Sequence, residues 1–133
     1  MKKILIILGI IASIIILILS IHYYHISSVK GIINEIYESN GNYHSEHILD
    51  SVIKQLNPRN ALDNSTDVVK EDFQIDSFTT TFDHKTMDYT YVYKVYGEEN
   101  GKEKLIYQDS RNICLHIEFH GLNWIIVSCK EIS

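Results

Sequence analysis

The chain has few cysteines, prolines and glycines, and it lacks the motifs that usually mark a catalytic or redox site. Its 133 residues include two cysteines, one proline and six glycines. The cysteines do not form a Cys-x-x-Cys pair, which disfavours thiol redox catalysis. No glycine-rich phosphate loop, nucleophile elbow or Ser/His/Asp order can be recognised. The missing motifs weigh modestly against an enzyme, and no cofactor is predicted.

The chain also lacks an excess of positive charge. It carries 12 Lys and Arg against 17 Asp and Glu. Without Lys2 and Lys3, the acidic excess from residue 22 onward rises to 7. An acidic surface repels phosphate groups, so nucleic-acid binding is disfavoured. A basic protein partner would be attracted instead.

Charge is absent altogether from residues 4–21, which are dominated by Ile and Leu. As a helix this stretch would extend roughly 27 Å, close to the hydrocarbon thickness of a bilayer. It therefore predicts a transmembrane helix, with the lipid bilayer as its partner. Without an ionisable residue it offers no ion pathway, which disfavours a transporter or channel. A cleaved signal peptide is the alternative, but the run is longer than usual and no small-x-small site follows it well.

The flanking residues predict the orientation of this helix. Lys2 and Lys3 favour the cytoplasmic side, so the rest of the chain should lie outside the cell membrane. The aromatic and histidine side chains of residues 22–25 suit the headgroup layer. We therefore expect a membrane anchor with an interfacial segment over residues 1–28. Residues 29–133 are long enough for one independent core and too short for two, and no flexible spacer precedes them.

Apolar spacing predicts two amphipathic helices at the start of this domain. The first stripe runs from Val29 to Tyr37, ends before Asn40-Gly41 and could continue directly from the membrane helix. The second runs from Ile48 to Leu56, with Ser45 as a plausible N-cap and Pro58 after its end. Residues 58–71 are polar and predict a connection.

From Asp72 onward the pattern alternates with a period of two, which predicts strands. Expected strands cover residues 72–82, with a bulge near Asp76-Ser77, then 87–96, 103–108, 112–120 and 123–131. Asn100-Gly101 and Gly121-Leu122 are the predicted hairpin turns. The fold class is therefore α+β: a transmembrane helix, then two helices on one face of a four- or five-stranded antiparallel meander.

This order of elements resembles the NTF2-like or cystatin-like group of α+β folds. The segment Gly121–Val127 is similar to the final strands of small extracytoplasmic NTF2-like domains in Gram-positive membrane proteins. The resemblance implies a binding or assembly module, although some members are enzymes. The fold usually has a third helix between its first two strands, and this sequence predicts none there.

The last hairpin predicts a disulfide. A two-residue turn at Gly121-Leu122 would place Cys114 directly opposite Cys129. Paired residues in antiparallel strands lie within disulfide range, and a disulfide can persist outside the cytoplasm. Two separate half-buried thiols are the alternative, since a shift of one residue would remove the pairing.

His116, Glu118 and His120 alternate along one strand and would share its outer face. Neighbouring members could bind a metal or act as acid and base. His116 and His120 lie about 13 Å apart in a strand, too far for all three to surround one zinc easily. We expect a solvated polar face and no metal.

Tyr89, Tyr91 and Tyr93 share one face of a predicted strand. Tyrosine provides a wide contact area, so this face could bind a protein; the alternative is that the rings line the core. The sequence thus predicts a membrane-anchored, non-catalytic protein-binding module, of an immunity or envelope-assembly type. The alternative is a small envelope hydrolase that uses His116, Glu118 or His120.

Overall fold

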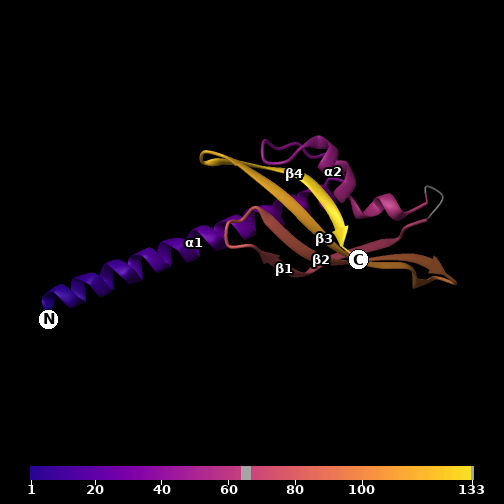
Figure 1. Cartoon of the computed structure of the whole chain (residues 1–133). Coiled ribbons are helices and arrows are strands. Elements are labelled where there is room, and N and C mark those ends of the chain that lie inside the picture. The colour runs from indigo at the N-terminus through magenta and orange to yellow at the C-terminus, as the bar shows by residue number, and fades with distance from the viewer. Residues whose placement is uncertain (64–66, 133) are drawn as a thin grey trace. The chain divides into compact units, whose positions relative to one another are not determined.

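A computed structural model describes residues 1–63 and 67–132 (Figure 1). The chain separates into two compact units, Met1–Ile32 and Ile33–Ser133. The residues 64–66 within the predicted connection lie outside the described part.

The first unit is formed by helix α1, Lys2–Glu38, which continues without a break into the second unit. All side chains from residue 1 to 21 are exposed. Even the polar groups suit a lipid environment, because the Ser13 and Ser20 hydroxyls donate to the carbonyls of Gly9 and Ile16, each at 2.8 Å. Among the described residues, α1 is the one helix long and apolar enough to cross a membrane. A single apolar N-terminal helix compatible with membrane anchoring is therefore present.

Helix α1 ends where the sequence predicts. Asn40 and Gly41 have φ angles of 54° and 81°. The Gly41 amide donates to the Ile36 carbonyl at 2.9 Å, which satisfies one of the last carbonyls of the helix. A side chain at position 41 would be strained at this φ.

The second helix, α2, is shorter than predicted and covers Asp50–Leu56. Ser45 is not its N-cap, because Leu49 occupies the cap position without a side-chain bond. The reason is tertiary: the His47 carbonyl accepts from the Ile126 amide at 2.8 Å, and the Leu49 amide donates to the Ile126 carbonyl at 3.2 Å. This pairing ties residues 47–49 to β4, so the helix begins only at Asp50. Pro58 opens a 3-10 turn, η1, Pro58–Ala61.

Four strands form an open antiparallel sheet in the order β1-β2-β3-β4. The sheet is a meander in which β3 is one strand where two were predicted. The bulge between Ile75 and Ser77 lies where it was predicted, and Asn100-Gly101 forms a two-residue turn. The strands are β1 Lys70–Thr80, β2 Thr86–Glu99, β3 Lys102–His120 and β4 Asn123–Ile132.

The core of the second unit lies between one face of this sheet and the two helical segments. Tyr37 at the end of α1 contacts Phe73 and Tyr93, and Gln55 of α2 contacts Cys129 on the same face. The architecture is therefore α+β. The buried apolar side chains of this unit are Ile33, Ile36, Ile48, Val52, Ile53, Leu56, Met87, Tyr89, Tyr91, Tyr93, Val95, Leu115, Ile117, Trp124 and Ile126.

Candidate functional site

The predicted disulfide is wrong because of a bulge in the last hairpin. The register follows the prediction from His120 opposite Asn123 to Ile117 opposite Ile126, and then shifts by one residue. Cys129 consequently pairs with Leu115, and Cys114 pairs with Lys130. Neighbouring residues on a strand point to opposite faces, so the two thiols lie on opposite sides of the sheet. Both are free cysteines.

His116, Glu118 and His120 lie on the outer face of β3, and all three are exposed. The His120 Nε2 lies 3.6 Å from a Glu118 carboxylate oxygen, with the two side chains 69% and 61% exposed. The described residues contain no group of three or more His, Cys, Asp or Glu side chains that could hold a metal. An acid/base site requires groups that converge in a concave pocket, and these three lie on an open surface.

Tyr89, Tyr91 and Tyr93 do not form an open binding surface, because their side chains are only 2%, 6% and 0% exposed. The odd-numbered positions of β2 from 87 to 97 are buried, and the even-numbered positions between them are half-buried or exposed. The interpretation of these rings as core residues is therefore correct. Their hydroxyl groups nevertheless lie in two different environments.

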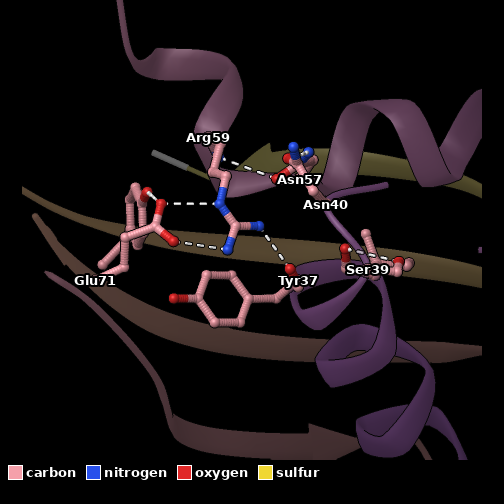
Figure 2. A network of polar contacts seen from close by, with 8 residues as sticks. Tyr37, Ser39, Asn40, Asn57, Arg59 and Glu71 are labelled. Carbon is pink, nitrogen blue, oxygen red and sulfur yellow. Dashed lines mark hydrogen bonds and ion pairs between the residues drawn. The ribbon is translucent and has the colours of Figure 1, made fainter. Parts of the chain in front are cut away.

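The Tyr93 hydroxyl belongs to a polar network that joins the end of α1, the turn η1 and strand β1 (Figure 2). It donates to Glu71 Oε1 at 2.5 Å. Arg59 binds the same carboxylate with two nitrogens, each at 2.8 Å, and its third donor reaches the Tyr37 carbonyl. The Arg59 guanidinium also lies 4.2 Å from the centre of the Tyr37 ring. This geometry combines a bidentate ion pair with a cation–π contact.

The network is a structural clamp. Arg59 and Glu71 are each 21% exposed, and their opposite charges balance. The Arg59 guanidinium and the Tyr93 hydroxyl hold the pKa of Glu71 below its usual value. Asn57 accepts from the Arg59 amide at 3.2 Å and donates to Asn40 at 3.0 Å, which ties η1 to the turn after α1. The Arg59 guanidinium and the Glu71 carboxylate are thus bound to each other and to neighbouring protein groups.

A separate cavity of about 200 Å³ lies between α2, η1 and the core face of the sheet. Tyr89 and Tyr91 form part of its floor. Among the described residues, neither hydroxyl has a hydrogen-bond partner. The rings are buried, but the two hydroxyls are accessible at the cavity, where water or a ligand group can bond to them. The lining residues are Gln55, Leu56, Asn57, Pro58, Asn60, Ala61, Tyr89, Tyr91, Arg111, Ile113, Cys129 and Glu131.

The cavity contains one cation whose charge is already balanced. Arg111 binds Asp109 through its Nε, and its Nη1 lies 3.6 Å from Glu131. Burial raises the pKa of Tyr91 to about 12, so its hydroxyl is a neutral donor at physiological pH. The Cys129 thiol donates to Gln55 at 3.0 Å, and burial raises its pKa as well. The cavity therefore presents hydroxyl and guanidinium donors and no thiolate nucleophile.

Sequence reasoning missed both the clamp and the cavity. Arg59 and Glu71 are separated by the polar connection, and neither belongs to a recognisable motif. Gln55, Arg111 and Glu131 come from α2, β3 and β4, and only the sheet register brings them together. The one available signal was the tyrosine alternation in β2, which correctly selected the strand face that contains Tyr89 and Tyr91.

Comparison with known proteins adds no identity to this geometry: no protein-family model, curated protein or solved structure matches the chain. The α+β architecture is present, but β1 and β2 are joined by the short segment 81–85 and no helix. The resemblance to NTF2-like or cystatin-like domains therefore stays a prediction.

Proposed function

We propose that the protein is a single-pass, membrane-anchored binding module whose folded unit lies outside the cell membrane and recognises a protein. The charge-free residues 4–21 of α1 support anchoring, and Lys2 and Lys3 support the orientation. An immunity-type protein and an envelope-assembly accessory protein are the two roles that suit such an arrangement. The proposal involves no catalysis.

The observation that carries the binding proposal is the pair of unpartnered hydroxyls of Tyr89 and Tyr91 in a cavity beside Arg111. All three groups can donate a hydrogen bond, so a ligand group with acceptor oxygens suits the cavity. Because Asp109 and Glu131 already balance Arg111, a neutral carbonyl or hydroxyl oxygen suits the cavity better than a free anion. The cavity volume of about 200 Å³ is enough for one polar side chain of a partner.

Binding also agrees better than hydrolysis with the chemistry of the cavity. General acid/base catalysis needs a group with a pKa near the working pH. Tyr91 and Cys129 both have pKa values raised away from neutrality by burial. The cavity has no histidine in its lining. These groups can orient a ligand without reacting with it.

The test is capture of a partner by the full chain in mild detergent, with crosslinking, from the envelope and secreted proteins of the source organism. Ala61→Trp would fill the mouth of the cavity from an exposed position. Glu103→Trp places the same side chain at an exposed site on β3 away from the cavity and is the matched control. We expect one stoichiometric partner with the wild type and the control, and its loss with Ala61→Trp. Capture that is unaffected by Ala61→Trp would overturn the proposal.

The orientation has an independent test. Ser110→Cys introduces an exposed thiol on β3, in a background where Cys114 and Cys129 are replaced by serine. A membrane-impermeant maleimide should label it on intact cells. Labelling only after cell lysis would place the domain in the cytoplasm and overturn the proposed orientation.

A further inference from the structure

Two exposed apolar side chains lie in turns at one end of the sheet. Phe82, between β1 and β2, is 93% exposed, and Leu122, between β3 and β4, is 101% exposed. An antiparallel meander places these two turns at the same end, opposite the β2–β3 turn (Figure 1). A hydrogen bond of 2.8 Å from the Ile117 amide to the Lys85 carbonyl ties the first turn to β3.

The turn that contains Phe82 is well ordered by its own polar groups. Asp83 Oδ1 accepts from the Thr81 hydroxyl at 2.7 Å and from the Lys85 amide at 3.1 Å. The Thr81 amide also bonds to the Thr86 carbonyl at 3.0 Å. The polar groups of the turn are thus used internally, while the ring of Phe82 projects into solvent.

The turn that contains Leu122 is equally compact. Gly121 has a φ angle of 68°, and His120 pairs directly with Asn123 across the turn. Turn positions usually carry Gly, Asn, Asp or Ser because of their backbone and hydrogen-bonding properties. Leucine has neither advantage, and here it is fully exposed. Both turns therefore present a large apolar side chain that folding does not require.

The opposite end of the sheet has a different chemistry. Its turn, Asn100-Gly101, lies between charged residues on both strands. Lys104 and Glu99 form an exposed ion pair there. Leu105 and Ile106, farther along β3, are 44% and 46% exposed, about half as much as Phe82 and Leu122. The turns at the two ends therefore differ in their affinity for an apolar phase.

We propose that the Phe82 and Leu122 turns insert into the interface of the bilayer that holds α1. Residues 22–32 alone separate the predicted span from the second unit, and as part of helix α1 they span only roughly 16 Å. This tether keeps the local concentration of membrane surface high, so a weak contact is sufficient. Phe and Leu side chains are those that interfacial segments bury in lipid. The contact would fix the orientation of the binding cavity relative to the membrane surface.

The experiment uses the full chain reconstituted in phosphatidylcholine liposomes, with Cys114 and Cys129 replaced by serine. Single cysteines at Phe82 and at Leu122 carry an environment-sensitive fluorophore. Lys102→Cys, next to the opposite turn, is the matched control and is also exposed. The liposomes contain lipids with a nitroxide near the headgroup, which quench dyes inserted about 5–10 Å into the interface. Thermal melting of each labelled protein checks that the fold is retained.

We expect blue-shifted emission and strong nitroxide quenching at positions 82 and 122, and neither at 102. Equal quenching at all three positions would overturn the proposal, because it would reflect proximity alone. No quenching at either turn would also overturn it and would leave a protein as the occupant of these side chains. The inference rests on the membrane anchoring in the proposed function. Failure of the wild type to float with liposomes would overturn both, whereas flotation without quenching overturns this inference alone.

Discussion

Replacing a tyrosine of β2 by phenylalanine should lower the stability at position 93, in the clamp, and leave it unchanged at position 89, in the cavity. Tyr93→Phe removes the hydrogen bond to the Glu71 carboxylate. Hydrogen bonds to charged groups contribute about 1.5–3 kcal/mol to stability. Because Glu71 keeps its two bonds to Arg59, we expect the lower end, a loss of about 1.5 kcal/mol.

Tyr89→Phe is the matched control. It removes the same atom from the same face of β2, but this hydroxyl has no partner among the described residues. We therefore expect a free energy of unfolding within about 0.5 kcal/mol of the wild type, because no hydrogen bond within the protein is lost.

Urea unfolding of the full chain in mild detergent measures both variants. The single tryptophan, Trp124, is buried in the core and reports the transition. The slopes against urea should agree among the proteins, so that the midpoints report stability. Equal losses for Tyr89→Phe and Tyr93→Phe would refute the reasoning, because packing of the rings and not the Glu71 bond would then dominate.

Three further predictions follow from the same contacts. The pKa of Glu71 is lowered, chiefly by Arg59. The ionised carboxylate therefore stabilises the fold above its usual pKa, and this contribution is lost as the pH falls through the lowered pKa. Unfolding scans below about pH 4 should show a steep loss of stability, and Glu71→Gln should reduce that loss. Burial raises the pKa of Tyr91 to about 12, so stability should fall as the pH rises from about 10 toward 12, and Tyr91→Phe should flatten that part of a melting-temperature profile. Cys114 and Cys129 lie on opposite faces of the sheet, so alkylation under denaturing, non-reducing conditions should add two labels per chain, as counted by mass spectrometry. A chain that takes up no label would show that the two cysteines form a disulfide.

Local patterns in the sequence were enough for most of the elements. A charge-free run of Ile and Leu can only be stabilised by an apolar environment, so the N-terminal helix was predictable from composition. The alternation of Tyr89, Tyr91 and Tyr93 identified a strand, and Asn100-Gly101 identified a turn, because both signals depend on adjacent residues. The end of α1 at Asn40-Gly41 was predictable for the same reason, since only certain residues adopt positive φ readily.

The tertiary structure decided which residues are paired across the strands and between distant segments. One extra residue in β4 moved Cys129 from Cys114 to Leu115, and no local propensity specifies such a bulge. Ser45 lost its predicted capping role because Ile126, far along the chain, pairs with residues 47–49. The partnership of Arg59 with Glu71, and the cavity over Tyr89, depend in the same way on contacts between distant segments. Periodicity shows which side chains share a face, but the partners of that face are set by the packing of the whole unit.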